Sequence, residues 1–117
     1  MIAIVDDDDG VRDMLVSLVR SLGYDARAFA SAEGFLASDD FGAFACAIVD
    51  IHMPGMSGFQ LKERLDELNS SLPVIMITAR TEPDLEQKAI SGGAIGFLRK
   101  PIEVDTLEGC IGKALGN

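Results

Sequence analysis

Short runs that contain only apolar residues constrain the fold of this chain more than any other feature. The clearest runs are Ile2–Val5, Ala45–Val49 and Val74–Ile77. Each run has the length of a strand and is too short for a helix of ordinary size. Because every position is apolar, both faces of each strand must be buried, which is typical of a parallel sheet covered by helices on both sides.

Segments with helical periodicity separate these runs. Apolar residues recur every three or four positions over Val11–Leu22, and Gly23 follows as a C-terminal cap. Tyr24–Phe29 alternates weakly and predicts an edge strand, after which Ser31 caps a short helix. Ile95–Leu98 predicts a last strand. Three further helices are predicted. The first carries Phe59, Leu61, Leu65 and Leu68, and the last carries Leu107, Ile111 and Leu115. The helix between them is predicted to begin with a capping box formed by Thr81 and Asp84, with Pro83 in its first turn.

Strand and helix therefore alternate five times along the sequence. This order predicts an α/β fold in which a doubly wound, five-stranded parallel sheet is flanked by five helices. A chain of 117 residues is long enough for one domain with its own core, and we expect residues 1–117 to form that domain.

The composition argues against two classes of function. Asp and Glu total 19 and Lys and Arg total 10, so the net charge is −9. Binding to nucleic acid needs clustered basic residues, so we expect this domain not to bind nucleic acid directly. No apolar run reaches the roughly 18 residues of a membrane span, so we expect no membrane contact and a cytoplasmic protein. Cys46 and Cys110 lack the spacing of a zinc site and are expected to be reduced thiols.

Polar side chains follow the apolar runs at the points where the predicted strands end. In chain order they are Asp6 and Asp7, then Asp50, then Thr78, then Lys100. A sheet of this kind binds its ligands beyond the carboxyl ends of its strands, so these side chains are expected to meet. Carboxylates brought together repel one another unless a cation joins them. The cluster therefore predicts a hard cation such as Mg2+ and, with the lysine and the hydroxyl, a phosphoryl-transfer site.

The four consecutive aspartates near the N-terminus divide into two pairs with different roles. Asp6 and Asp7 lie at the predicted strand end and face the expected cation. Asp8 and Asp9 fall at the start of the first helix, where negative charge suits the helix dipole and a carboxylate can cap free N–H groups.

Taken together, these motifs resemble the receiver domains of two-component response regulators. The resemblance covers essentially the whole chain and rests on VDDDD at 5–9, VDIHMPGMSG at 49–58, MITA at 76–79 and GFLRKP at 96–101. The stretch VRSLGYDARAFASAEGFLA is similar to receivers of the FixJ type. The resemblance implies the strand order 2-1-3-4-5 of the flavodoxin-like or CheY-like fold.

The resemblance also implies a phosphorelay function. Asp50 would be the phosphoacceptor, taking a phosphoryl group from the phosphohistidine of a sensor histidine kinase or a phosphotransfer protein. Lys100 would pair with one phosphoryl oxygen and Thr78 would hydrogen-bond another. Such a domain is not an enzyme in the usual sense, because it catalyses only its own phosphorylation and dephosphorylation.

The cofactor implied by the resemblance is Mg2+, for which Mn2+ or Ca2+ can substitute. Asp7, Asp50 and the backbone carbonyl of His52 would bind the metal directly, and Asp6 would bind it through water. The lone histidine cannot make a zinc site by itself, and its carbonyl is the expected contributor.

Four further features are implied by the resemblance. Thr78 and Phe97 would act as the switch, changing position together on phosphorylation and altering the face of the fourth helix, fifth strand and fifth helix. His52 and Arg80 occupy positions that tune the lifetime of the phosphoryl group in this family. The sequence is equally compatible with a second interpretation, in which both side chains are exposed and inert. The Lys100–Pro101 peptide bond is expected to be cis, which turns the lysine toward the site. Phosphorylation is expected to favour a homodimer through the fourth helix and fifth strand.

Several alternatives to a phosphorylated receiver remain. The protein is either a stand-alone receiver or the N-terminal part of a FixJ-like transcriptional regulator, and a degenerate receiver would serve only as a protein-binding module. A phosphohydrolase of the haloacid dehalogenase type would need a second aspartate two positions after Asp50, where His52 stands. A flavodoxin-like nucleotide binder would need a Ser/Thr/Gly-rich loop after the first strand, where this chain has aspartates.

Overall fold

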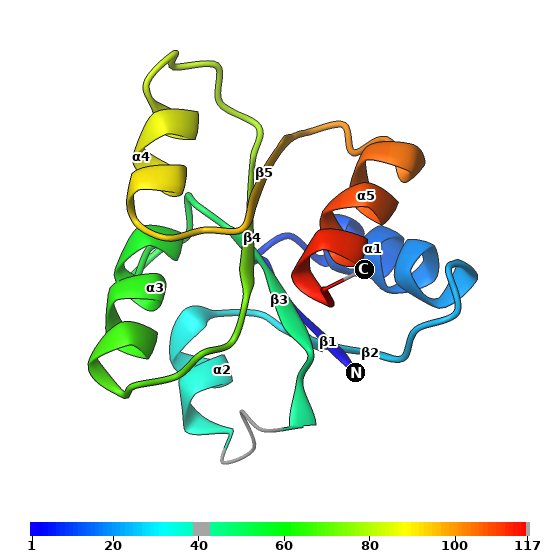
Figure 1. Ribbon diagram of the computed structural model, residues 1–117, viewed down its shortest axis with the longest axis horizontal. Helices are drawn as coiled ribbons and strands as arrows, with labels where there is room; N and C mark the ends of the chain where they lie inside the picture. Colours follow the sequence, from blue (N-terminus) through cyan, green and yellow to red (C-terminus); the bar gives the residue numbers. More distant parts are fainter. Residues whose placement is uncertain (39–42, 117) are drawn as a thin grey trace.

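The computed structural model describes residues 1–38 and 43–116, in which five strands alternate with five helices (Figure 1). The strands are β1 (Ile2–Val5), β2 (Ala26–Phe29), β3 (Cys46–Asp50), β4 (Val74–Thr78) and β5 (Gly96–Arg99). The helices are α1 (Asp9–Ser21), α2 (Ala32–Ala37), α3 (Gly58–Glu67), α4 (Leu85–Ser91) and α5 (Val104–Ala114).

The strands form one parallel sheet in the order β2-β1-β3-β4-β5, which confirms the predicted fold and topology. Val5 at the end of β1 pairs with Val49 of β3. Asp6, which follows β1, and Asp50, the last residue of β3, are each one residue further along and therefore lie at the same edge of the sheet on adjacent strands. The register of the sheet thus places the two carboxylates side by side.

Helices cover the sheet on both faces. Figure 1 shows α1 and α5 on one face and α2, α3 and α4 on the other. Alternate residues of β1 point to opposite faces of the sheet. Ile2 and Ile4 pack with α1 and α5, whereas Ala3 and Val5 pack in the buried layer on the other face. All four are fully buried, which is the physical reason for a strand that is apolar at every position.

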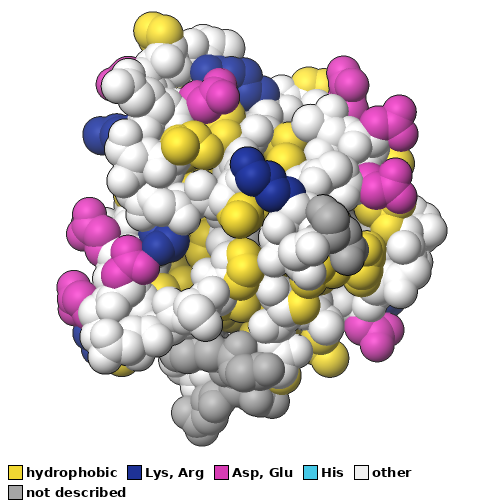
Figure 2. Space-filling view, in the orientation of Figure 1, with side chains coloured by type: hydrophobic (Ala, Val, Ile, Leu, Met, Phe, Trp, Pro, Cys, Tyr) yellow, Lys and Arg dark blue, Asp and Glu magenta, His cyan; other side chains and the backbone are white. Residues whose placement is uncertain are grey.

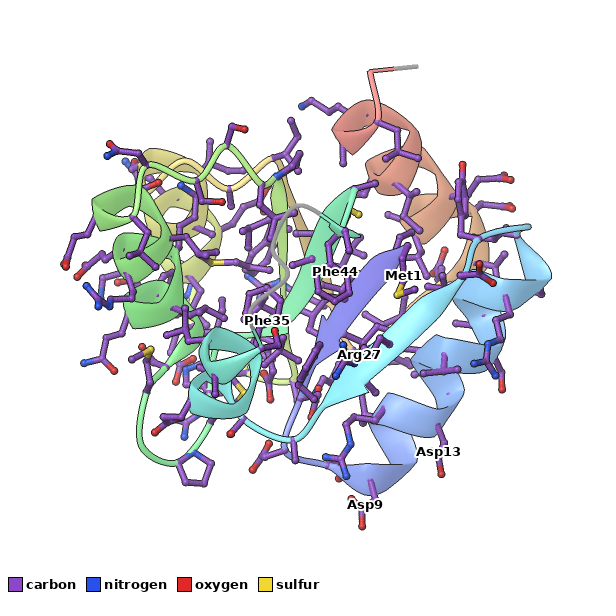
Figure 3. All side chains as sticks on the ribbon, turned by 90° about the horizontal axis from the view of Figure 1, so that it is seen from below. Met1, Asp9, Asp13, Arg27, Phe35 and Phe44 are labelled. Carbon is purple, nitrogen blue, oxygen red and sulfur yellow. The ribbon has the colours of Figure 1, made fainter. Side chains whose placement is uncertain are left out.

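The first helix begins as the acidic run predicts. Asp8 is its N-cap and accepts a hydrogen bond from the backbone N–H of Val11 at 3.0 Å. Asp9 lies in the first turn, and Figure 3 shows its side chain on the outer side of α1 with that of Asp13. Gly23 ends the helix with a φ of 95°, a left-handed conformation in which glycine is not strained.

The predicted capping box at Thr81 and Asp84 is wrong. Helix α4 begins at Leu85, and in the described residues Asp84 at its N-cap makes no side-chain capping hydrogen bond. A box starting at Thr81 would require helical geometry at Glu82. The proline that follows, Pro83, disfavours that geometry in the residue before it, so the helix starts later.

The two cysteines pack between the sheet and helix α5 as unpaired thiols. Cys46 is buried in β3, and burial raises the pKa of its thiol to about 11. Cys110 of α5 is half-buried, and its Sγ lies 3.0 Å from the place where a Cβ on Gly96 would stand. Both thiols are unpaired, as the sequence predicts, and Gly96 lets α5 approach β5 closely.

On the other face, aromatic rings fill the space under α2. The rings of Phe35 and Phe44 have centroids 5.7 Å apart, and Phe29 of the edge strand packs on both. Figure 3 shows Phe35 and Phe44 between α2 and the sheet. This aromatic packing anchors the edge strand β2, in which apolar and polar residues alternate only weakly.

Candidate functional site: an acidic cluster at the carboxyl edge of the sheet

The carboxyl ends of β1 and β3 bring three carboxylates together. Asp6, Asp7 and Asp50 each offer an oxygen, and these oxygens all lie within 4.8 Å of one another. Asp6 is fully buried, Asp50 is 5% exposed and Asp7 is exposed. The structure therefore assembles the acidic cluster that the sequence predicts, with two carboxylates inside the protein and one at its mouth.

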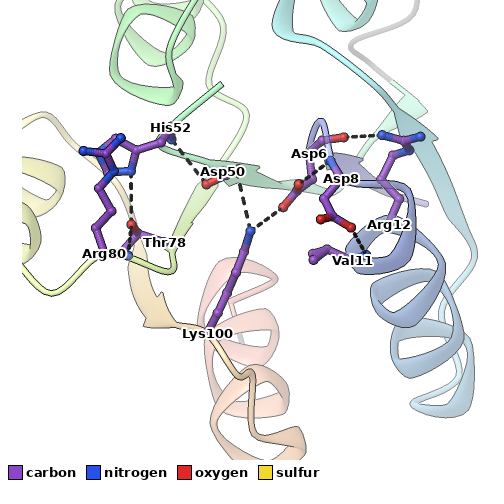
Figure 4. Close-up of polar contacts among 9 residues, drawn as sticks. All are labelled: Asp6, Asp8, Val11, Arg12, Asp50, His52, Thr78, Arg80 and Lys100. Carbon is purple, nitrogen blue, oxygen red and sulfur yellow. Dashed lines mark hydrogen bonds and ion pairs between the residues drawn. The ribbon is translucent and has the colours of Figure 1, made fainter. Parts of the chain in front are cut away.

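Lys100 is the cation of the site (Figure 4). Its Nζ lies 3.0 Å from Oδ2 of Asp6 and 3.6 Å from Oδ2 of Asp50. The backbone N–H of Lys100 donates to the carbonyl oxygen of Thr78 at 2.8 Å, which ties the end of β5 to that of β4. The Lys100–Pro101 peptide bond is cis, the isomer that the resemblance implied.

The charges in the site do not balance. Burial raises the pKa of Asp50, the negative charge of Asp6 raises it further, and Lys100 acts in the opposite direction. For Lys100, burial alone would lower the pKa, but hydrogen bonding and attraction to Asp6 and Asp50 outweigh burial and raise it. One ammonium group therefore leaves the carboxylates with excess negative charge.

The residues present fit a hard divalent cation. Oδ2 of Asp6 is buried, and its ion-pair partner among the described residues is Lys100, whose Nζ lies 3.0 Å away. Carboxylate oxygens of Asp6, Asp7 and Asp50 are the ligands that Mg2+ prefers, and Mn2+ and Ca2+ also accept oxygen ligands. A cation here would supply the positive charge that the cluster lacks.

His52 and Thr78 border the cluster on the other side of Asp50 (Figure 4). The backbone N–H of His52 donates to Oδ1 of Asp50 at 3.3 Å. Nδ1 of His52 lies 3.2 Å from Oγ1 of Thr78, and the N–H of Arg80 donates to the same hydroxyl oxygen at 3.0 Å. Thr78 is fully buried, so its hydroxyl depends on these protein partners.

The remaining predicted residues lie further out. The Arg80 side chain is 60% exposed, and its guanidinium lies 3.7 Å from a carboxylate oxygen of Glu82. Phe97 is partly buried against the core, and the guanidinium of Arg99 lies 5.1 Å above its ring. Arg99 also donates to the carbonyl oxygen of Arg80 at 2.7 Å, so it connects the Phe97 ring with the loop after β4.

Three supporting residues escaped the sequence analysis. Arg12 of α1 pairs with Asp9 and donates to the carbonyl oxygen of Asp6 at 2.7 Å. Glu33 of α2 accepts the N–H of Met56 at 3.3 Å and steadies the loop after β3. A Cβ on Gly58 would lie 2.6 Å from the carbonyl oxygen of Asp50. Only Gly58 had a local signal, the second glycine of PGMSG.

The comparisons with known proteins agree with this geometry. A family model described as the response regulator receiver domain matches residues 2–111. The chain belongs to this family. Receivers are phosphoacceptor signalling domains of bacterial two-component systems, and phosphorylation and Mg2+ binding are typical of them.

Named relatives of this receiver are response regulators. Response regulator protein TmoT of Ectopseudomonas mendocina is 43% identical over 98% of this chain and 52% of its own length. Transcriptional regulatory protein FixJ of Bradyrhizobium diazoefficiens is 34% identical over 97% of this chain and 56% of its own length. The crystal structure of FixJ-N has a TM-score of 0.88 at 30% identity and covers 99% of this chain and 93% of that chain. The receiver spans about half the length of these curated relatives.

The distribution of charged side chains on one face of the molecule agrees with the acidic composition of the sequence. Figure 2 shows acidic side chains around the rim of one face, and the Lys and Arg side chains that it colours are scattered over that face. Within residues 1–38 and 43–116, every helix is too short or too polar to cross a membrane. Neither a phosphohydrolase nor a nucleotide binder is favoured by the comparisons.

Proposed function

We propose that this receiver takes a phosphoryl group from a phosphohistidine onto Asp50. The observation that carries the proposal is the position of the Asp50 carboxylate. It lies between the acidic pair and Lys100 on one side and the His52–Thr78 contact on the other. Asp50 belongs to the acidic cluster, lies beside the ammonium group of Lys100 and accepts the N–H of His52, whose ring contacts the hydroxyl group of Thr78.

In the proposed step, a carboxylate oxygen of Asp50 attacks the phosphorus atom of the donor phosphohistidine. The new P–O bond forms as the P–N bond breaks, and the imidazole leaves with the electron pair of that bond, giving an acyl phosphate on Asp50. Burial and the charge of Asp6 raise the pKa of this carboxyl, and Lys100 acts in the opposite direction and favours the ionised, nucleophilic form. Mg2+ held directly by Asp7, Asp50 and the His52 carbonyl, and through water by Asp6, would neutralise charge on the phosphoryl oxygens.

Lys100 and Thr78 serve the phosphorylated state in this proposal. The ammonium group of Lys100 already lies 3.6 Å from a carboxylate oxygen of Asp50, where it would pair with a phosphoryl oxygen. Thr78 donates its hydroxyl proton to another phosphoryl oxygen after changing partners. Phe97 then moves inward behind Thr78 and alters the surface of α4, β5 and α5.

Incubation with Mg2+ and acetyl phosphate tests the proposal. The intact protein should gain the mass of one phosphoryl group, and Asp50→Asn should gain none. Asp13→Asn is the matched control, because Asp13 is an exposed aspartate on the outer side of α1 and should leave phosphorylation unchanged. A wild-type protein with unchanged mass would contradict the proposal and favour a receiver that acts only as a binding module. An Asp50→Asn protein that is still phosphorylated would also contradict the proposal, because the phosphoryl group would then lie on another residue.

We also expect Arg80 to protect the phosphoryl group. Its exposed guanidinium carries a positive charge two residues beyond Thr78, where it can screen the phosphoryl group from attacking water. Arg80→Ala should therefore shorten the lifetime of the acyl phosphate, measured as loss of the added mass with time. An unchanged lifetime would refute this role.

We propose the partners of the receiver by analogy with its family. A sensor histidine kinase or a phosphotransfer protein in the cytoplasm supplies the phosphoryl group, and TmoT and FixJ, as regulators, suggest control of transcription by a longer protein. Phosphorylation is proposed to favour a homodimer through α4 and β5. Light scattering with and without beryllofluoride should show a rise in mass, and a constant mass would argue against the dimer.

A further inference from the structure

The side chain of His52 holds the hydroxyl group of Thr78. Nδ1 of His52 lies 3.2 Å from Oγ1 of Thr78, and the backbone N–H of Arg80 donates to the same oxygen at 3.0 Å (Figure 4). Thr78 is fully buried and His52 is half-buried, so water has little access to the contact. The hydroxyl group is therefore held from two sides by the loops after β3 and β4.

A hydroxyl group has one proton to donate and two lone pairs that accept. At Thr78, one lone pair already accepts the N–H of Arg80. Nδ1 of a neutral imidazole is an acceptor when the ring proton is on Nε2, so the Thr78 hydroxyl then donates to it. In that arrangement Thr78 has no proton left for a third group.

A phosphoryl oxygen is only an acceptor, so Thr78 can bind it only by donating this one proton. We infer that His52 is a positioning residue that holds the Thr78 hydroxyl in the resting protein and competes with a phosphoryl group on Asp50 for its proton. The inference rests on the proposed function and adds a regulatory contact to the same site. The hydrogen bond between His52 and Thr78 must therefore break before Thr78 can bind a phosphoryl group, which makes the phosphorylated conformation less favourable.

The imidazole can be changed without removing the other contact of His52. Its backbone N–H, not its ring, donates to Oδ1 of Asp50. His52→Leu replaces the ring with an apolar side chain that has no acceptor. His52→Asn is the matched variant, because its amide oxygen can take the place of Nδ1 and accept the same proton.

Beryllofluoride with Mg2+ is the probe for the competition, and backbone amide NMR signals of Thr78 and Arg80 report its binding. His52→Leu should bind beryllofluoride about threefold to tenfold more tightly than wild type, the range expected for one hydrogen bond. His52→Asn should bind close to wild type. In a Thr78→Ala background the gain from His52→Leu should disappear, because the hydroxyl for which His52 competes is absent.

The ring proton of His52 gives a second test that needs no ligand. Long-range 15N NMR of the free wild-type protein, in mildly alkaline buffer where imidazoles are generally neutral, should place the proton on Nε2. A proton on Nδ1 would overturn the inference, because the imidazole would then donate and the Thr78 proton would be free.

The outcomes separate the inference from the proposed function. A wild-type protein that does not respond to beryllofluoride with Mg2+ overturns both. If wild type responds, equal affinity in His52→Leu overturns the inference alone. A gain that persists in the Thr78→Ala background also overturns the inference alone, because His52 would then act through another group.

Discussion

At the scale of single residues, the site is a group of charges held in an unfavourable arrangement. Burial and the charge of Asp6 both raise the pKa of Asp50, and Lys100 offsets only part of this effect. Asp6 follows β1 and Asp50 ends β3, and because these two strands pair, the sheet itself holds the two carboxylates together. Such preorganisation lowers stability and prepares the site for a cation.

The raised pKa of Asp50 predicts that Asp50→Asn stabilises the protein without divalent cations. From the ordinary aspartate pKa of about 3.9 up to the raised folded pKa, the folded state holds more protons than the unfolded state. Stability therefore falls as pH rises through that window, and the penalty persists at any pH above the raised folded pKa. Urea unfolding in EDTA should give the variant a higher free energy of unfolding at neutral pH.

The advantage of Asp50→Asn should fade as the pH falls below the ordinary aspartate pKa, because the wild-type carboxyl is then protonated in both states. Asp13→Asn serves as the control. Asp13 is exposed on α1, and a surface change of this kind should stay within about 0.5 kcal/mol. A variant at position 50 that is less stable than wild type at neutral pH would contradict the electrostatic argument.

At the scale of elements, the site depends on how closely α3 approaches β3. The N–H of Gly58, the first residue of α3, donates to the carbonyl oxygen of Ile51 at 2.9 Å. Ser57 and Gln60 form a capping box at the same helix end, so the start of α3 is fixed beside Asp50. Little space remains between this helix end and the backbone of Asp50.

Gly58→Ala should therefore destabilise the protein and distort the site. The added Cβ would stand 2.6 Å from the carbonyl oxygen of Asp50 and 2.9 Å from Cα of Ile51, and backbone cannot yield easily. We expect a loss of about 1–3 kcal/mol in the free energy of unfolding, the usual cost of overpacking, measured by urea denaturation. Phosphorylation by acetyl phosphate should also slow, because the Asp50 backbone is displaced.

Gly109 provides the control for this change. It lies within α5, and nothing lies within 4 Å of the place of its Cβ. Gly109→Ala should stabilise the protein by roughly 0.5–1 kcal/mol through helix propensity alone. If both alanine variants changed stability in the same direction, close approach at Gly58 would not be the cause.

At the scale of the whole molecule, the site joins the ends of β1, β3, β4 and β5. Residues of these strands lie in both buried layers, so the site exists only when the sheet is formed. A ligand that binds the folded state and not the unfolded chain must then stabilise the entire fold.

Mg2+ should therefore raise the free energy of unfolding by about 2.7 kcal/mol when its concentration is a hundredfold above the dissociation constant. Urea unfolding with and without MgCl2, at ionic strength matched with NaCl, measures the gain apart from simple screening. Asp7→Asn should lose most of it and Asp13→Asn should keep it. An equal gain in the Asp7 variant would show that the cation binds elsewhere.

Much of this molecule could be predicted from its sequence. The apolar runs predicted buried strands, their alternation with helical periods predicted the parallel sheet, and Asp8 predicted the start of α1. The residues after the strands predicted the composition of the site. The capping box at Thr81 failed, because the conformational effect of Pro83 on Glu82 overrides the local pattern.

The sequence by itself determined which side chains stand at the carboxyl edge of the sheet, because strand periodicity and parallel order are local and topological properties. Only the tertiary structure decided which of them touch. The His52–Thr78 contact, the Arg12 bond to the Asp6 carbonyl and the Arg99 bond to the Arg80 carbonyl join separate segments of the chain. Their partners are set by sheet register and side-chain rotamers, and neither leaves a pattern along the chain.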